Sequence, residues 1–335
     1  MDATQPPARR KILIIRLSSM GDIVLTTPVV RVLDEQLDQV EIHYLLKKQN
    51  EDVLAFNPHI DKLHFFEGDM KATIQELKAE KFDFVVDLHR KYRSRRICCS
   101  LGVPYSVMHK LDIRKMLLVR LKANLLPVKH VVDCYFEALR PLHVKNDGKG
   151  LDFFIPDNQE FDTDDLPVFF DDGYVAVVLG AAHATKRIPV SKIIEIVTIL
   201  HRPIILLGGS DVADEGEEIV SQLGDRAYNA CGKFNILQSA SLINQSACVL
   251  TGDTGLMHIA AALGKPVCSL WGNTVPEFGM YPYMPGQRKK FRLFEVQGLC
   301  CRPCSKRGFK KCPYRHFKCM MQIPAIEVAE WINQF

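Results

Sequence analysis

Long hydrophobic runs are missing from this chain of 335 residues. The first apolar run, Ile12 to Ile15, is far shorter than the roughly 20 residues of a membrane-spanning helix, and no later run approaches that length. The stretch from Met1 to Arg10 is polar and carries prolines, so it does not look like a signal-peptide core. Eleven cysteines, an odd number, occur without an export signal. We therefore expect a reducing cytoplasm and no disulfide framework.

Three common motifs of enzymes with parallel sheets are also missing. No Gly-x-Gly-x-x-Gly follows an apolar run, which disfavours nicotinamide and flavin dehydrogenases. No Gly-x-x-x-x-Gly-Lys-Ser/Thr occurs, because Gly264-Lys265 is followed by Pro266, and this excludes an ordinary P-loop enzyme. A Gly-x-Ser-x-Gly nucleophile elbow is absent as well.

Positive charge is concentrated in two segments, although the net charge of the chain is only +4. Asp87 to Lys122 holds ten Lys/Arg against two Asp/Glu, and Gly286 to Cys319 holds eleven against one, so their net charges are +8 and +10. Such segments suit a phosphate-bearing partner or an anionic membrane surface, and a solvated basic face is the alternative. They lack the regular arrangement of a nucleic-acid module, so we expect no nucleic-acid partner.

Short β-branched runs alternate with amphipathic segments along the chain, which predicts parallel, doubly wound sheets. An acidic stretch, Asp157 to Asp172, separates two such series and is the expected linker. The expected strands are Lys11 to Arg16, Val40 to Leu45, Leu63 to Phe66, Phe82 to Asp87, Tyr174 to Leu179, Ile204 to Leu207, Ala247 to Leu250 and Pro266 to Leu270. Among the expected helices are Met70 to Lys81, Pro189 to His201 and a short apolar one, Pro324 to Phe335.

The candidate site residues lie in loops that follow predicted strands, where this fold class binds ligands. The first loop runs from Arg16 to Asp22 and combines small residues, a glycine and a carboxylate. Its backbone amides can approach a ligand, and Asp22 can accept a proton from a sugar hydroxyl. Alternatively, Asp22 only caps the following helix.

Two loops of the second series offer contacts to a nucleotide. Lys186 and Arg187 lie in the loop that Gly180 opens, where they can neutralise a diphosphate or serve as ordinary surface charges. The segment Leu207 to Asp211, followed by Asp214 and Glu215, is a weaker candidate for the wall of a ribose or base pocket.

The most informative loop runs from Thr251 to His258, between an apolar strand and the expected helix Leu256 to Leu263. The first turn of that helix would present free N–H groups and a positive dipole end, which bind phosphate without a metal. Asp253 or Thr254 could instead be a simple N-cap, and His258 a core histidine.

Together these blocks resemble glycosyltransferase family 9, the ADP-heptose:lipopolysaccharide heptosyltransferases. The opening block is Arg16-x-Ser18-Ser19-x-Gly21-Asp22 followed by Thr26-Thr27-Pro28. Three later blocks follow in the family's order: Thr185-Lys186-Arg187-x-Pro189, Gly252-Asp253-Thr254-Gly255-x-x-His258 and Leu270-x-Gly272-x-Thr274. The likeness spans nearly the whole chain.

The resemblance implies an α/β protein with the GT-B fold, in which two Rossmann-like doubly wound domains face a central cleft. Residues 1–160 would bind the acceptor, residues 161–323 would bind the nucleotide sugar, and the helix at 324–335 would cross back to the N-terminal domain. The implied activity is inverting transfer of a heptose from ADP-heptose to a lipopolysaccharide-core or related glycolipid acceptor. The protein would act in the cytoplasm, peripherally associated with the inner membrane.

The resemblance also assigns roles to individual residues. Asp22 would be the general base, with Ser18, Ser19, Gly21 and Arg93 on the acceptor side. Lys186 and the amides of Thr254 and Gly255 would hold the departing diphosphate, and no cofactor is required. The remaining donor-side residues would be Thr185, Glu215 near the nucleoside, Asp253 and His258.

Two stretches depart from the family, Asn273 to Glu277 and Asp87 to Lys91, so sugar and acceptor identity are not carried over. Cys301, Cys304, Cys312 and Cys319 could bind zinc or form a thiol-rich loop. Two other activities remain open: a nucleotide-sugar epimerase or hydrolase of the same fold, and a non-catalytic nucleotide-sugar-binding protein.

Overall fold

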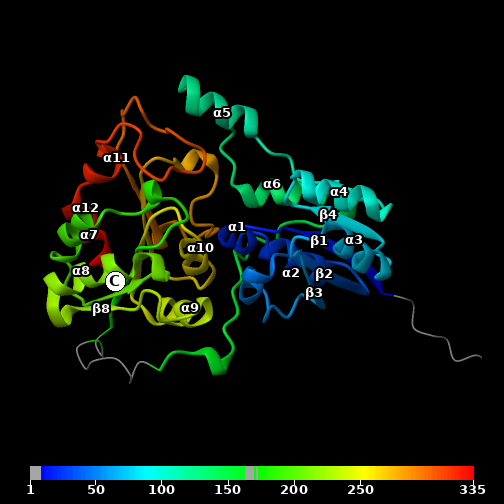
Figure 1. The fold of residues 1–335 in the computed structure, drawn as a ribbon, viewed down its shortest axis with the longest axis horizontal. Helices are drawn as coiled ribbons and strands as arrows, with labels where there is room; N and C mark the ends of the chain where they lie inside the picture. The colour runs from blue at the N-terminus through cyan, green and yellow to red at the C-terminus, as the bar shows by residue number, and fades with distance from the viewer. Residues whose placement is uncertain (1–8, 163–169, 171–172) are drawn as a thin grey trace, which may run out of the picture. The chain divides into compact units, whose positions relative to one another are not determined.

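The computed structural model describes residues 9–162, 170 and 173–335. These residues form two compact units (Figure 1). Unit 1 holds the described residues up to Lys110 together with Val131–Lys149, and unit 2 holds Leu111–His130 and everything from Gly150 onward. Of the expected linker at 157–172, residues 163–169 and 171–172 lie outside the described residues.

Unit 1 is built on a five-stranded sheet in the order β3-β2-β1-β4-β5, in which every paired strand is parallel. Its strands are β1 (Arg10–Ile15), β2 (Val40–Leu46), β3 (Lys62–Phe65), β4 (Phe84–Asp87) and β5 (Tyr105–Val107). Its helices are α1 (Met20–Val24), α2 (Thr27–Gln36), α3 (Met70–Ala79), α4 (Tyr92–Leu101) and α6 (Val131–Ala138), with 3-10 turns at Lys48–Val53 and Arg140–Leu142.

The inner strands of unit 1, β1, β2 and β4, form because their side chains are buried on both faces. Leu13, Ile15 and Leu45 pack on one face with Leu77 of α3 and Ile97 of α4. The first four predicted strands are confirmed within one or two residues. The sequence did not predict β5, because this three-residue edge strand is only partly buried and gives too short a pattern.

Unit 2 is built on a six-stranded parallel sheet in the order β11-β10-β9-β6-β7-β8. Its strands are β6 (Val175–Val178), β7 (Ile204–Leu207), β8 (Ala227–Asn229), β9 (Cys248–Thr251), β10 (Val267–Trp271) and β11 (Phe291–Glu295). Its helices are α5 (Asp112–Leu121), α7 (Val190–Val197), α8 (Ala213–Leu223), α9 (Ile236–Gln245), α10 (Gly255–Ala262), α11 (Lys318–Met321) and α12 (Ala325–Ile332). The 3-10 turns are η3 (Asp157–Gln159), η6 (Ala184–Lys186), η7 (Ser210–Val212), η8 (Gly224–Arg226), η9 (Pro276–Phe278) and η10 (Arg288–Lys290).

Alternate residues of the central strands pack into two separate cores, one on each face of the sheet, which is the doubly wound arrangement. Val175 and Val177 of β6 pack with α7, α8 and α12, whereas Ala176 and Val178 pack with α9 and α10. The predicted fold class is therefore confirmed for both sheets. The sequence did not predict β11, an edge strand inside the basic segment, because its exposed Arg292 interrupts the apolar pattern.

The C-terminal helix corrects one expectation. Val328, Ala329 and Ile332 of α12 are buried in the core of unit 2, where α12 packs on α7 and β10. Its end is held there too, because Asn333 accepts a hydrogen bond from the His201 amide at 3.1 Å. The expected crossing to the N-terminal domain is therefore wrong: the apolar stripe is covered within the second unit.

The N-terminal half of the chain instead contributes to unit 2. Leu118 of α5 packs against Val275 and Phe278, and the Lys115 ammonium donates to the Phe278 carbonyl at 2.7 Å. The expected boundary at residues 160 and 161 also shifts, because unit 2 takes up Leu111–His130 and resumes at Gly150. In the part of the chain that the structure describes, no helix is both long and apolar enough to span a membrane.

Candidate functional site

Asp22 lies at the carboxyl end of β1, in the first turn of α1. Its Oδ2 accepts hydrogen bonds from the Ser19 amide at 3.2 Å and the Ser19 hydroxyl at 2.8 Å. Its Oδ1 lies 2.6 Å from Nη2 of Arg16, and 20% of the Asp22 side chain remains exposed. The carboxylate thus caps α1, as one hypothesis proposed, yet it also forms an ion pair and keeps a solvent-facing side.

Arg16 is held so firmly that it works as a fixed support for Asp22. Its Nε donates to the Ser18 carbonyl at 3.0 Å and its Nη1 to the Leu88 carbonyl at 2.6 Å, so it bridges the ends of β1 and β4. The guanidinium also lies over the ring of Tyr135, 5.8 Å from the centroid. Because Arg16 is buried and multiply bonded, the position of the Asp22 carboxylate is well defined.

The electrostatics of this pair keep Asp22 ionised. Burial by itself raises the pKa of Asp22, but the charge of Arg16 and the hydrogen bonds from Ser19 outweigh it and lower the pKa to about 2. The same partnership raises the pKa of Arg16 despite its burial. At neutral pH the loop therefore presents a charged carboxylate that can accept a proton.

The predicted acceptor-side residues have different surroundings. Ser19 is exposed and bonded to Asp22, Ser18 supplies the carbonyl that holds Arg16, and Gly21 is buried in α1. Arg93 lies on α4 with its guanidinium over the Phe66 ring, and it is not among the described side chains that bond to Asp22. The structure thus gathers three of the four residues around Asp22.

His89 is a residue of this site that the sequence pattern did not single out. It follows β4, beside Arg16, and within the described chain its Nδ1 is buried without a hydrogen-bond partner. Burial and the charges of Arg16 and Lys110 lower the pKa of His89 to about 3, so its ring is neutral. Asp87 is buried and accepts hydrogen bonds from the amides of His89 and Arg90 and from the Ser94 hydroxyl, so it ties the turn after β4 to α4.

In unit 2, three loops at the carboxyl ends of the strands converge on one ion pair. Nζ of Lys186 lies 2.6 Å from Oδ2 of Asp253, and the Thr274 hydroxyl donates to the same oxygen at 2.9 Å. Lys186 ends η6 after β6, Asp253 follows β9, and Thr274 follows β10. The sequence predicted Lys186 and Asp253 for the donor site, and the structure places them in direct contact.

The loop after β9 packs closely against the loop after β6 at Gly252. A Cβ on Gly252 would lie 2.4 Å from the Lys186 carbonyl oxygen, so only glycine fits there. Thr254 then begins α10, because its hydroxyl accepts the Met257 amide at 3.2 Å and contacts the Thr251 hydroxyl at 3.0 Å. Gly255 follows as the first residue of the helix, beside the positive end of its dipole.

The other predicted donor-side residues have supporting positions. The Thr185 side chain is buried and its hydroxyl bonds to the Phe309 backbone, so it anchors the Lys186 loop. Glu215 lies in the first turn of α8, 3.6 Å from Nη1 of Arg187, which also pairs with Asp211. His258 is buried on α10 with 2% of its surface exposed.

Two further residues organise this region, and the sequence pattern identified neither as a site residue. The Arg302 side chain is only 7% exposed and donates to the carbonyls of Gly272 and Thr274 at 2.6 Å and 3.1 Å, so it shapes the loop after β10. Between these residues, Asn273 is 1% exposed, and neither polar atom of its side chain has a hydrogen-bond partner in the described part of the chain. Burying an amide without hydrogen-bond partners costs free energy, and contact with a bound ligand would explain why the protein keeps one here.

Comparison with known families identifies the chain at this point. The family model of glycosyltransferase family 9 (heptosyltransferase) matches residues 70–314, well over half of the sequence. The chain belongs to glycosyltransferase family 9. The resemblance inferred from the four blocks is thereby confirmed, although Asp22 lies before the matched residues, so its role depends on the geometry above.

Curated relatives of this family 9 chain are heptosyltransferases. It is 30% identical over 133 residues to lipooligosaccharide heptosyltransferase 2 of Haemophilus influenzae, and this stretch spans 38% of each chain. It is 25% identical over 279 residues to lipopolysaccharide heptosyltransferase 3 of Escherichia coli, which covers 76% of this chain and 81% of that one. The match to the first of these relatives thus spans well under two thirds of that protein's length.

A solved structure extends the likeness to the fold. The E. coli heptosyltransferase WaaC with ADP-2-deoxy-2-fluoro heptose superposes with a TM-score of 0.69 at 17% identity, and the match covers 97% of this chain and 99% of that one. The two parallel sheets thus confirm the GT-B fold in this family 9 member.

The cysteines of this family 9 member are all free thiols. Cys301 lies near His316, with Sγ 3.8 Å from Nε2, and Cys319 is buried on α11. Among the described residues, however, the cysteine segment does not bring three ligand atoms within binding distance of one another. The zinc hypothesis for this segment therefore gains no geometric support.

Proposed function

We propose that this chain transfers a heptose from ADP-heptose to a hydroxyl of a lipopolysaccharide-core or related glycolipid acceptor, with inversion at the anomeric carbon. The observation that carries the proposal is the Asp22 carboxylate, which is ionised, fixed by Arg16 and Ser19, and still 20% exposed. A base needs a defined position and access to the acceptor proton, and this residue has both.

The proposed step is a single displacement. The acceptor oxygen forms a bond to the anomeric carbon, the bond from that carbon to the diphosphate oxygen breaks, and Asp22 takes the hydroxyl proton. With a pKa of about 2, Asp22 is a weak base toward a free hydroxyl. The proton therefore moves late, because the hydroxyl becomes acidic only as its oxygen bonds to the sugar. Arg16 then stays paired to a neutral acid, and its bonds to backbone carbonyls hold it in place.

The donor side of the proposal uses unit 2. A bound diphosphate is negative enough to replace Asp253 as the ion-pair partner of Lys186. The amides of Thr254 and Gly255 at the start of α10 would complete its binding. Asp253 would then hold donor hydroxyls, and Glu215 would contact the nucleoside. Because a lysine and helix amides supply the positive charge, we propose no required metal. The ligand of the E. coli WaaC structure, ADP-2-deoxy-2-fluoro heptose, supports this donor class.

The test is a donor panel with and without acceptor. We expect ADP-heptose to be consumed only when a heptose-deficient lipopolysaccharide core is present, and the product to have the inverted anomeric configuration. Lys186→Met should weaken ADP-heptose binding by roughly 10- to 100-fold in calorimetry, because it removes a charge-assisted hydrogen bond to phosphate. Rapid donor consumption without acceptor would instead identify a hydrolase or epimerase. Binding without turnover on any acceptor would indicate a non-catalytic protein.

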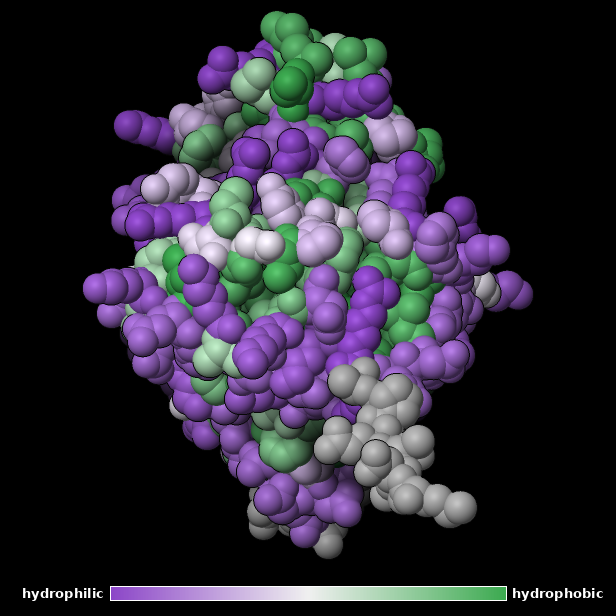
Figure 2. Space-filling model, turned by 90° about the vertical axis from the view of Figure 1, so that its right-hand side faces the viewer, coloured by the Kyte–Doolittle hydropathy of each residue, from purple (hydrophilic) through white to green (hydrophobic). Residues whose placement is uncertain are grey.

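We further propose that α5 contacts an anionic membrane on the cytoplasmic side, where a lipid-linked acceptor lies. Ile113, Leu121 and Val128 are strongly exposed, beside Arg114 and Arg120. Figure 2 shows apolar and charged side chains gathered over α5 at the top of the view. Large apolar side chains with basic neighbours suit the boundary between headgroups and acyl chains.

A vesicle assay tests this contact. The chain should sediment with vesicles containing phosphatidylglycerol at low salt, and Ile113→Ser with Leu121→Ser should release it. Turnover on a detergent-solubilised acceptor should persist in that variant. Equal binding by the variant and the unchanged chain would contradict the assignment of α5.

A further inference from the structure

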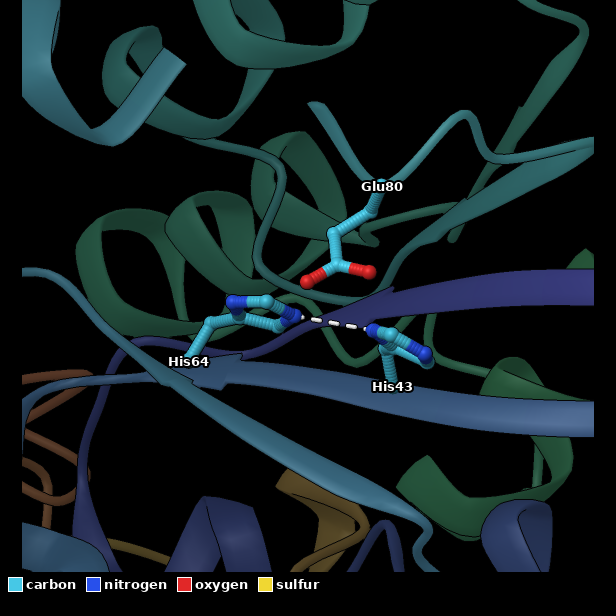
Figure 3. Close-up of side chains that lie close together, drawn as sticks. All are labelled: His43, His64 and Glu80. Atoms are coloured by element: carbon cyan, nitrogen blue, oxygen red, sulfur yellow. Dashed lines mark hydrogen bonds between the residues drawn. The ribbon is translucent and has the colours of Figure 1, made fainter. Parts of the chain in front are cut away.

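Two histidines face each other inside unit 1, away from the residues described above. His43 lies on β2 and His64 on the neighbouring strand β3, and both are buried, with 0% and 1% of their surfaces exposed. Nδ1 of His43 lies 2.8 Å from Nε2 of His64 (Figure 3). The Phe82 ring packs edge-on against both imidazoles. A pair of buried, adjoining imidazoles needs an explanation, because each ring nitrogen must donate or accept.

The outer nitrogens of both rings are already committed to carboxylates. Nε2 of His43 lies 2.7 Å from Oε1 of Glu41, and Nδ1 of His64 lies 2.7 Å from Oε1 of Glu76. An ionised carboxylate only accepts hydrogen bonds, so each outer nitrogen carries a proton. Two neutral imidazoles then turn their inner lone pairs toward each other. Something positive, a proton or a metal ion, must lie between them.

Glu80 supplies a third ligand atom at the same point. Its carboxylate follows α3, and the ligand atoms of His43, His64 and Glu80 all lie within 4.8 Å of one another (Figure 3). Lys62 and Lys11 pair with this carboxylate at 2.5 Å and 3.4 Å. The Lys62 side chain is 52% exposed, so it can turn into solvent when another cation takes its place.

We propose that Nδ1 of His43, Nε2 of His64 and the Glu80 carboxylate bind a divalent transition-metal ion, for which zinc is the best fit. Two imidazoles and a carboxylate are a common ligand set for zinc, with water free to complete a tetrahedron. Zinc–nitrogen bonds of about 2.0–2.1 Å at a tetrahedral angle require the two nitrogens to lie about 3.3 Å apart. The rings would therefore separate by about half an ångström from the 2.8 Å of the metal-free pair.

The outer carboxylates strengthen this assignment. Histidine ligands of metals usually donate their other N–H to a carboxylate, which fixes the tautomer and raises the basicity of the ligand nitrogen. Glu41 and Glu76 already occupy these positions. The site therefore has its inner and outer shells in place, and a metal would replace the shared proton without changing the outer hydrogen bonds.

The position of the site implies a structural role. Because side chains alternate along β2, His43 points to the face covered by α3 and α4, whereas Tyr44 points to the other face and bonds to Thr26 at 2.8 Å. β3 is an edge strand. A bound ion would tie this edge to β2 and to the end of α3, and would stabilise unit 1 without contacting Asp22.

The first test uses cobalt as a spectroscopic probe of the full chain. The double variant Cys301→Ser, Cys304→Ser provides the background, because thiols could otherwise bind the ion. We expect about one cobalt ion per chain, with visible bands of a tetrahedral nitrogen and oxygen site and no thiolate charge-transfer band. Zinc should displace the cobalt and raise the unfolding temperature. No bound ion in this background would overturn the proposal.

Variants then assign the ligands. His64→Gln should abolish the cobalt spectrum, and Glu76→Ala, which alters only an exposed outer partner, should weaken binding by roughly 10- to 100-fold. His59→Gln is the matched control, a half-buried histidine of unit 1 paired with Asp34, and should bind as the parent does. Unchanged cobalt binding in both His64→Gln and Glu76→Ala would overturn the proposed site. If His64→Gln fails to fold, Glu76→Ala alone decides the test.

Discussion

Replacing Asp22 with asparagine separates its proposed catalytic role from its role in stability. Asp22→Asn keeps the size of the side chain and an oxygen for Ser19, but it removes the charge that Arg16 faces at 2.6 Å. The pKa of Asp22 falls from 3.8 to about 2, which at 1.36 kcal/mol per unit is a stabilisation of the carboxylate by about 2.5 kcal/mol. We expect the variant to lose about this much unfolding free energy, or about 5–10 °C in unfolding temperature. Turnover should fall by roughly 100- to 10,000-fold, because the base is lost.

A second ion pair of unit 1 provides the matched control. Arg31 is buried and pairs with Asp147 at 2.8 Å, and Arg31 lowers the pKa of that carboxyl too, against the opposing effect of burial. Asp147→Asn should therefore also lose stability and yet keep its turnover. The assay is initial-rate transfer from ADP-heptose, with donor affinity measured by calorimetry, which Asp22→Asn should leave unchanged. Turnover of Asp22→Asn within about tenfold of the parent would refute the assignment of the base.

Three further predictions concern pH and the donor loops. Because the pKa of Asp22 is depressed to about 2, its base form and its stabilising charge are both present above about pH 4 and are lost only as the pH falls toward 2. An acidic inflection of kcat/KM near pH 6 that moved in Ser19→Ala would contradict this. Gly252→Ala places a Cβ 2.4 Å from a backbone oxygen, so it should lower the unfolding free energy by about 1–3 kcal/mol and weaken donor binding. In Gly180→Ala the atom nearest to the new Cβ would lie 3.4 Å away, so this control should change neither quantity. Asn273→Leu should stabilise the donor-free protein by about 1–2 kcal/mol in thermal unfolding, because it removes a buried amide that has no partner in the described part of the chain. The same variant should weaken donor binding in calorimetry. A loss of stability with unchanged affinity would show that the amide serves the fold alone.

The fold could be predicted from the sequence wherever strands are buried on both faces. Such strands are continuous apolar runs, and β1, β6, β7 and β9 were all identified from them. The edge strands β5, β8 and β11 were not predicted, because they are short or carry exposed residues that break the apolar pattern, although the edge strand β3 was. The placement of α5 in unit 2 could not be predicted either, since Leu118 meets Val275 and Phe278 across more than 150 positions of sequence.

The site was predictable where loops follow strands, and unpredictable where distant segments meet. Lys186 and Asp253 each carry a local signal, a charged residue after a buried strand, and the structure joins them in one ion pair. Arg302 carries no such signal, because it lies within a basic segment and its partners are backbone carbonyls thirty residues away. His89 is similar: only the fold shows that it lies beside Arg16 and that its Nδ1 has no hydrogen-bond partner among the described residues.

The basic residues of the two positively charged segments fall into two groups in the structure. Arg302 pairs with Glu295 and donates to backbone carbonyls of unit 2, so its charge is already neutralised within the protein. Arg93, Arg95 and Arg96 of α4 are exposed. An anionic acceptor or membrane would therefore meet fewer charges than the sequence suggests. Salt dependence of acceptor binding should follow the α4 arginines and be insensitive to Arg302, because a charge already paired within the protein releases no counterion on binding.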